Sequence, residues 1–123
     1  MKVAFTTSGD TMNSPLDARF GRAEKFIVYD MEKEVFEVIS NERNLNAAQG
    51  AGIQAAETIV RSGAECLVTG HCGPKAFRVL STSGIKIFNA GSCSVAEALE
   101  QFRAGKLTPA QSADVEEIGR AHV

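Results

Sequence analysis

The hydrophobic period of this chain changes near Asn41, and the change limits the folds that are open to it. Before Asn41, short segments rich in Val, Ile, Phe and Tyr have the apolar pattern of β-strands. These predicted strands span residues 2–7, 25–30 and 34–40. Only three residues, 31–33, separate the second strand from the third, so we expect the two to form an antiparallel hairpin.

After Asn41, segments with helical spacing alternate with short apolar runs. Helices are predicted over 48–62, over 74–83 and from Ser94 onward, with strands over 65–69 and 85–89 between them. Ser94 and Glu97 have the spacing of a capping box at the start of the last helix. Gly63 and Gly105 follow the first and last of these helices and mark their ends.

The resulting order, βββαβαβα, predicts an α/β domain with helices on both faces of a mixed sheet. Right-handed crossovers favour five strands in the order 3-2-1-4-5. This three-layer arrangement resembles the ribonuclease H-like topology, a name that describes shape and not activity. We expect the domain to span residues 1–107 and the polar, alanine-rich segment 108–123 to be a mobile tail.

Charge and hydrophobicity exclude several classes of partner. The chain carries 13 Lys and Arg against 15 Asp and Glu, a formal net charge of −2. Nucleic-acid binding is disfavoured, because it requires a basic excess. No apolar run approaches the roughly 18 to 20 residues that span a bilayer, and the first residues lack the apolar stretch of a signal peptide. The sequence therefore predicts a cytoplasmic protein with no membrane partner.

The three cysteines differ in their predicted positions. Cys66 lies within an apolar strand and is expected to be a buried, inert thiol. Cys72 and Cys93 each follow a predicted parallel strand and directly precede a helix. Ligands of open α/β sheets bind at these carboxyl ends, and a helix N-terminus lowers the pKa of a nearby thiol. Thiolates are ligands for soft metals and sulfide clusters, and the imidazole of His71 is a further metal ligand.

These residues also have plainer interpretations. Cys72 and Cys93 can be small residues that fill tight turns, and His71 can be a polar loop residue. The long segment 7–22 is rich in turn-forming residues, and loops of this length are usually functional or disordered. Its Arg19 and Arg22, together with Lys75, either surround an anion or form solvated surface charge.

Other activities lack the residues they require. The segment 70–75 does not contain the pattern of a phosphate-binding loop. A two-metal nuclease needs clustered carboxylates, and the first and fourth predicted strands supply none that point inward. With only three soft ligands, a closed tetrahedral zinc site is incomplete, so an open or cluster-accepting site fits better.

Four stretches of the sequence resemble a known family. They are Ser14 to Ala23, Gly50 to Ala56, and Gly73 to Leu80 followed by Gly84 to Ile87. Together they are similar to the dinitrogenase iron-molybdenum cofactor biosynthesis family, the NifX/NifB-type domain, over residues 1 to 107. The resemblance implies a ribonuclease H-like domain that carries iron-molybdenum cofactor or a related iron- or molybdenum-sulfide cluster, as a chaperone and not as an enzyme. It also implies cofactor-assembly or acceptor proteins as partners.

The predicted cluster-binding residues combine these arguments. They are Arg19, Gly21, Arg22, His71, Cys72, Gly73 and Cys93, with His71, Cys72 and Cys93 as the metal ligands. Gly73 allows close approach of the backbone, and the two arginines complement an anion. Two alternatives stay open: a thiol enzyme with Cys72 or Cys93 as the nucleophile and His71 as the base, and an interaction module with a vestigial site.

Overall fold

The computed structural model describes residues 1–41 and 51–110. Within them the elements are β1 (Lys2–Thr7), β2 (Lys25–Asp30), β3 (Val35–Ser40), α2 (Ala51–Arg61), β4 (Cys66–Thr69), α3 (Pro74–Thr82), β5 (Lys86–Asn89), α4 (Val95–Arg103) and β6 (Thr108–Pro109). The first three strands and the three helices lie where the sequence places them, with boundaries shifted by a residue or two. The start of the predicted first helix, 48–50, lies outside the described residues.

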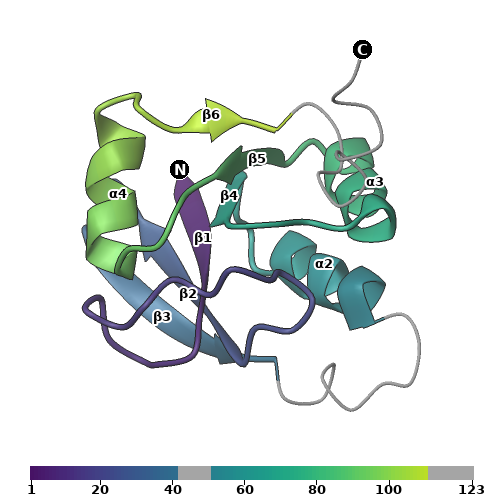
Figure 1. Cartoon of the computed structure of the whole chain (residues 1–123), viewed down its shortest axis with the longest axis horizontal. Helices are drawn as coiled ribbons and strands as arrows, with labels where there is room; N and C mark the ends of the chain where they lie inside the picture. The colour runs from purple at the N-terminus through teal and green to yellow at the C-terminus, as the bar shows by residue number, and fades with distance from the viewer. Residues whose placement is uncertain (42–50, 111–123) are drawn as a thin grey trace.

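The strands form one mixed sheet in the order β3-β2-β1-β4-β5-β6. β1, β2 and β3 pair antiparallel in sequence, so β3 runs in the direction of β1. α2 then carries the chain from β3 to β4 and α3 carries it from β4 to β5, and β4 pairs parallel with both β1 and β5. Figure 1 shows α2 and α3 together on one side of the sheet and α4 on the other. The predicted order of the first five strands is confirmed.

The predicted strand count of five is wrong, because a sixth strand, β6, pairs antiparallel with β5. β6 consists of Thr108 and Pro109, which were expected to begin the mobile tail, and Ala110 N donates a further hydrogen bond to Ile87 O at 2.7 Å. A strand of two residues has no period that a sequence can reveal. The remainder of the predicted tail, 111–123, lies outside the described residues.

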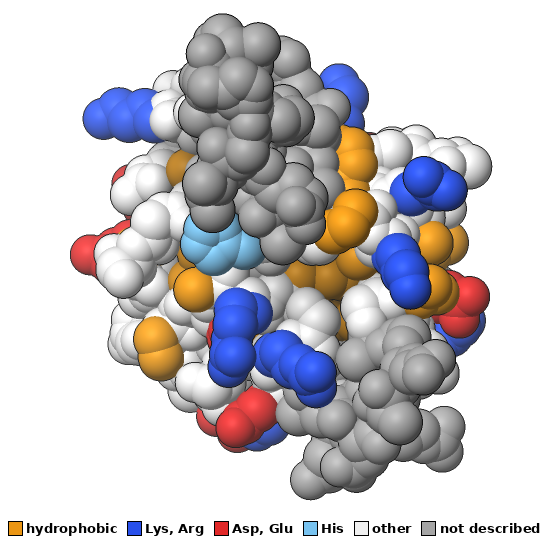
Figure 2. Space-filling model, turned by 45° about the vertical axis from the view of Figure 1, so that its right-hand side comes forward, with side chains coloured by type: hydrophobic (Ala, Val, Ile, Leu, Met, Phe, Trp, Pro, Cys, Tyr) orange, Lys and Arg blue, Asp and Glu red, His pale blue; other side chains and the backbone are white. Residues whose placement is uncertain are grey.

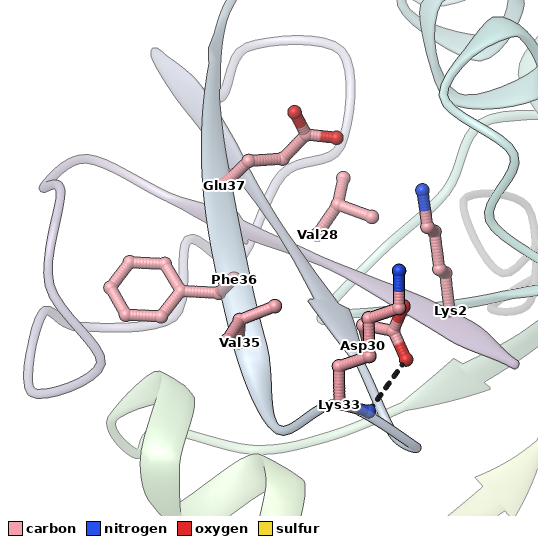
Figure 3. A pocket seen from close by; sticks show the side chains of 7 residues that line it. All are labelled: Lys2, Val28, Asp30, Lys33, Val35, Phe36 and Glu37. Atoms are coloured by element: carbon pink, nitrogen blue, oxygen red, sulfur yellow. Dashed lines mark hydrogen bonds between the residues drawn. The ribbon is translucent and has the colours of Figure 1, made fainter.

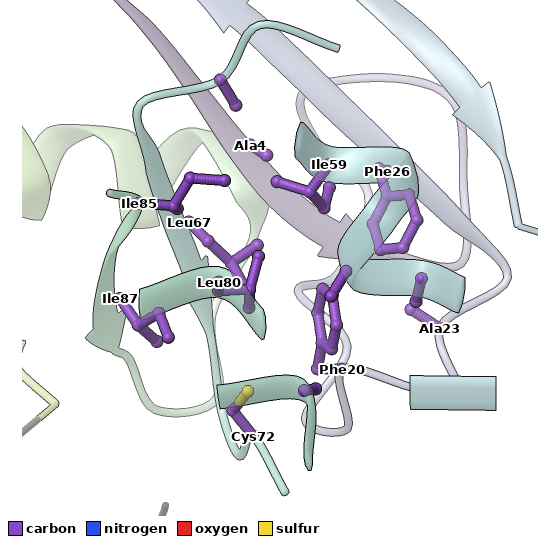
Figure 4. Packing of buried hydrophobic residues seen from close by; sticks show 14 of the residues in the cluster. Ala4, Phe20, Ala23, Phe26, Ile59, Leu67, Cys72, Leu80, Ile85 and Ile87 are labelled. Carbon is purple, nitrogen blue, oxygen red and sulfur yellow. The ribbon is translucent and has the colours of Figure 1, made fainter. Parts of the chain in front are cut away.

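Alternation along the strands divides the core in two. Ala4 of β1 faces α2 and α3, whereas Val3 and Phe5 face α4. The first cluster includes Phe20, Phe26, Ile59, Leu67 and Leu80, each no more than 1% exposed; Figure 4 shows these side chains packed between the sheet and the helices. Residues that adjoin along the chain can therefore belong to opposite faces of the sheet.

Candidate functional site

Residues 8–22, which form most of the connection from β1 to β2, cross the carboxyl ends of the central strands; we call this segment the strap. Asp17 N donates to Thr6 O at 2.8 Å, which ties the strap to the end of β1. Beyond β4, His71 N donates to Ala18 O at 2.7 Å and Phe20 N donates to His71 O at 3.0 Å. The strap is thus held by backbone hydrogen bonds to segments that are distant in the sequence.

Gly70 lets the strap approach the end of β4 closely. A Cβ atom on Gly70 would lie 2.6 Å from Ala18 O and 2.8 Å from Ala18 Cα, distances shorter than van der Waals contact. The side-chain amide of Asn89, at the end of β5, donates to Gly70 O at 3.0 Å and fixes the same turn from the other side. The absence of a side chain at Gly70 therefore sets the position of the strap.

The N-terminus of α4 is closed by the strap. Val95 N donates to Ser14 O at 2.9 Å, and Ala96 N donates to Met12 O at 2.8 Å. The predicted capping box is confirmed: Glu97 N donates to Ser94 Oγ, and Ser94 N donates to Glu97 Oε1. Since these amides already have acceptors, the start of α4 offers them to no further anion, and the role predicted for Cys93 finds no support from this helix end.

The N-terminus of α3 is organised differently. Pro74 lies in the first turn, as predicted, and no side chain caps the helix. Its first hydrogen bond runs from Phe77 N to Gly73 O at 2.9 Å, so the amides of Lys75 and Ala76 point out of the helix end. This helix start retains the electropositive character that α4 has lost.

A cleft lies between the starts of α2 and α3 and the end of the strap. Its volume is about 400 Å³, and it is lined by Gly21, Gly52, Ile53, Gly73, Pro74, Lys75 and Ala76. A Cβ atom on Gly52 would meet only Ala76 Cβ, at 3.5 Å, so the helices approach each other closely here. On the face that carries α2 and α3, hydrophobic side chains gather in the middle and Lys and Arg side chains stand around them (Figure 2).

Charge in and around the cleft is positive. Neither α2 nor α3 has an acidic residue in its first turn, and Lys75 contributes to the lining. Arg22 follows the lining residue Gly21 and is exposed. Among the described residues, no carboxylate lies within 4.0 Å of the charged nitrogens of Arg19, Arg22 or Lys75. The cleft therefore combines an uncapped helix start, close backbone approach and cationic side chains, a combination suited to an anion.

The structure separates the two thiols that were predicted to act together. Cys72 is 2% exposed and packs in the cluster beneath α2 and α3, next to the lining residue Gly73; Figure 4 shows it on the same side of the sheet as Phe20. Cys93 packs against the cluster beneath α4, on the opposite face. The two thiols thus follow neighbouring strands at one edge of the sheet but pack in different clusters.

The expectation that Cys93 ionises readily is also wrong. Burial raises the pKa of the Cys93 thiol, and the carboxylate of Glu97 raises it further. The pKa of Cys66 is raised by burial as well, which agrees with its predicted place as an inert thiol in the core of β4.

His71 joins the strap through its backbone, and its side chain is exposed. Among residues 1–41 and 51–110, no group of three or more His, Cys, Asp and Glu side chains is placed to hold a metal ion. The predicted ligand set of His71, Cys72 and Cys93 is therefore not gathered in the structure.

Of the predicted site residues, Gly21 and Gly73 line the cleft. Arg22 follows Gly21 in the strap, and Arg19 forms a β-bridge with His71. The prediction missed Gly52 and Ile53 of α2. A glycine at the second position of a helix is a signal for close approach, but its partner helix is known only from the tertiary structure.

Comparisons with known proteins agree with one another. A family model described as dinitrogenase iron-molybdenum cofactor matches residues 1–105. A protein of Methanocaldococcus jannaschii without an assigned function is 33% identical over 110 residues, which cover 87% of this chain and 89% of that protein. Separately, no helix in the described ranges combines the length and the apolar character that crossing a membrane requires.

Two solved structures share both fold and sequence with this chain. The apo form of the orange protein from Desulfovibrio gigas superposes with a TM-score of 0.88 and 36% identity, over 91% of this chain and 94% of that one. A NifB-type protein from Thermotoga gives a TM-score of 0.79 and 33% identity, over 88% of this chain and 91% of that one.

Proposed function

Because this chain belongs to the dinitrogenase iron-molybdenum cofactor family, we propose that it is a small carrier that binds an anionic iron-molybdenum or related metal-sulfide cluster in the cleft between α2 and α3. The cluster is the cargo of the protein, and cofactor-assembly or acceptor proteins are its partners. The chain acts as a carrier and not as an enzyme.

The observation that carries this proposal is the uncapped start of α3 at the cleft. An anion there meets outward-pointing amides, the positive end of the helix and the ammonium group of Lys75. Gly21, Gly52 and Gly73 present backbone without side chains, which leaves room for a ligand larger than a single ion. Arg19 and Arg22 add positive charge beside it.

The names of the similar proteins support the same class of ligand. The family is described by the iron-molybdenum cofactor, and the orange protein was solved in a form called apo, a form without its ligand. These descriptions belong to those proteins. They direct the proposal for this chain toward a metal-sulfide cluster and away from a phosphate or a nucleotide.

Of the two thiols, Cys72 is the better candidate for a sulfur ligand of the cluster. The neighbour of Cys72 lines the cleft, whereas Cys93 lies on the other face with a raised pKa. Because Cys72 is 2% exposed, its sulfur reaches a cluster only after a local rearrangement. His71, the third predicted ligand, is exposed beyond β4 and contacts the cluster from the rim.

The thiol-enzyme alternative loses support from the same observations. A nucleophilic cysteine needs a thiolate and an accessible base. Cys93 has a raised pKa, Cys72 is buried, and the side chain of its neighbour His71 is exposed.

The test is anaerobic reconstitution of the full chain with iron, sulfide and molybdate, followed by absorption spectroscopy and metal analysis. We expect a chromophore in the native protein and its loss in Gly52→Leu, whose side chain fills the cleft. The matched control is Gly91→Leu, because Gly91 is exposed and has open space where a Cβ atom would be. Thermal melting of each variant checks that the fold is kept.

Two outcomes would overturn the proposal. One is a native protein that takes up no chromophore under any of these conditions. The other is a folded Gly52→Leu variant with the native spectrum and metal content, because that result would place the cluster elsewhere. Cys72→Ala and Cys93→Ala then separate the thiols: we expect the first to alter the spectrum and the second to leave it unchanged.

A further inference from the structure

β3 is an edge strand with an unusual amount of exposed apolar surface. Its residues Val35, Phe36 and Val38 are 56%, 41% and 39% exposed. They are three of the five large hydrophobic residues that are exposed in the described part of the chain. Figure 1 shows β3 at the end of the sheet away from β5 and β6, with no helix beyond it. An exposed edge of this kind is a template for pairing with another strand.

The free backbone groups of β3 follow from its pairing with β2. Asn41 N donates to Glu24 O at 2.8 Å, and this pair continues the antiparallel register of the two strands. Hydrogen-bonded pairs alternate along an antiparallel ladder. The backbone N–H and C=O groups of the odd-numbered residues of β3 therefore point toward β2. The N–H and C=O groups of Phe36 and Val38 therefore point outward from the sheet.

The face of β3 on the side of α2 carries charged side chains of both signs. A hollow of about 240 Å³ there is lined by Lys2, Val28, Asp30, Lys33, Val35, Phe36 and Glu37. Figure 3 shows the side chains of Lys2, Lys33 and Glu37 on one side of the strand and the ring of Phe36 on the other. Among the described residues, neither lysine ammonium has a carboxylate within 4.0 Å, and Glu37 has no cationic partner within that distance.

We propose that this edge binds a second copy of the chain, by antiparallel pairing of the two β3 strands about a two-fold axis at Phe36. Such a contact is self-complementary, as a two-fold interface must be. In this register Phe36 lies directly opposite Phe36 of the second copy, and Val35 lies directly opposite Glu37 of the second copy. Phe36 forms a hydrogen-bonded pair with its counterpart, which uses its outward backbone groups.

Charge selects this register over its neighbours. A two-fold axis at Glu37 would place the two Glu37 carboxylates directly opposite each other, which is destabilising. An axis at Val38 would place Phe36 opposite the polar Ser40 and would leave Glu37 without a lysine. With the axis at Phe36, the two Glu37 carboxylates are diagonal and not directly opposite, and the turn that carries Lys33 of the second copy precedes the Val35 that faces Glu37, which brings a long lysine side chain near each Glu37. The two pairs of Glu37 with Lys33 then lie on one face of the joined sheet, and the pair of Phe36 rings lies on the other.

This inference does not rest on the cluster-binding function, because the β3 edge contributes no residue to the cleft. The first test is sedimentation velocity of the metal-free full chain over concentrations up to about 1 mM. We expect a concentration-dependent dimer that becomes a monomer in Phe36→Lys. Val60→Lys is the matched control, since Val60 is exposed to a similar degree, 38%, but lies on α2. A native protein that stays monomeric throughout overturns the proposal.

The second test reverses the charges. We expect Lys33→Glu and Glu37→Lys each to weaken the dimer roughly tenfold, because each change alters both symmetric pairs. The double variant, which exchanges the two charges, should recover most of the native affinity. If both single changes and the double change leave the dissociation constant unaltered, the β3 register is wrong even when a dimer exists.

Discussion

At the scale of single residues, Gly70 has the most constrained position in the site. The carbonyl of Ala18 occupies the space that a side chain would need, and the same carbonyl accepts the hydrogen bond from His71 N. The strap therefore cannot move away from an added methyl group without losing that hydrogen bond. Phe20, two residues further along, is 1% exposed and packs on Phe26 with ring centroids 5.7 Å apart, so the strap is held on both sides.

We predict that Gly70→Ala lowers the free energy of unfolding by about 1 to 3 kcal/mol, as overpacking typically does. Chemical denaturation measures the change. Gly91→Ala is the control, because Gly91 has open space at the corresponding atom. A Gly70→Ala variant with native stability would mean that the strap is not fixed by this contact.

The thiols give a second prediction at this scale, in pH dependence. Burial and the Glu97 carboxylate both favour the protonated form of Cys93 and raise its pKa, so its thiolate forms only above the ordinary range of a cysteine. The rate of alkylation of Cys93 by iodoacetamide, followed by mass spectrometry, should therefore still be rising with pH where a free thiol has reached its plateau. Glu97→Gln removes the repelling charge and should move the curve to lower pH. An unshifted curve would contradict the assignment.

At the scale of elements, the stability of α4 depends on its N-cap at Ser94, which also helps to occupy the amides at the start of the helix. We predict that Ser94→Ala costs about 1 kcal/mol of stability, the usual value for loss of an N-cap hydroxyl. Ser92→Ala is the control, because Ser92 is exposed and precedes the capping box. Thermal melting of the two variants decides the point, and equal melting temperatures would show that the strap carbonyls hold α4 without Ser94.

The elements also show what a sequence can and cannot predict here. Hydrophobic period and glycine stops located α2, α3 and α4 within a few residues, because these signals are local. The capping box at Ser94 was equally local and is present. In contrast, the closure of α4 depends on carbonyls of Met12 and Ser14, and a backbone carbonyl leaves no trace in a residue pattern.

The dependence on tertiary contacts also explains which residues of the candidate site could be predicted from the sequence. Gly21 and Gly73 belong to stretches that resemble the family and were predicted as site residues, whereas Gly52 required knowledge of which helix packs against α3. Cys72 and Cys93 have similar positions in the sequence, each between a strand and a helix. Their packing in different clusters could not be predicted, because the side of the sheet that each helix covers follows from the crossovers and not from the residues beside the thiol.

At the scale of the whole molecule, local charge must overcome the net charge. The formal charge of the chain is −2, so an anion is repelled weakly at long range and attracted only near the cationic groups beside the cleft. We predict that binding of an anionic cluster weakens as ionic strength rises, because attraction by exposed cations is screened. Titration at two salt concentrations measures this. Lys75→Gln should reduce the salt dependence, while Lys106→Gln, at an exposed position outside the cleft lining, should not.

The two edges of the sheet differ in their capacity to pair with a strand of another chain. β3 is six residues long and turns the N–H and C=O groups of alternate residues, Phe36 and Val38 among them, outward, whereas β6 has two residues, of which Pro109 has no N–H to donate. A strand can add to the first edge and finds no template at the second. Self-association through the sheet must therefore stop when two β3 edges have met. The short, proline-bearing edge thus makes a closed pair the end point and excludes an open filament of stacked sheets.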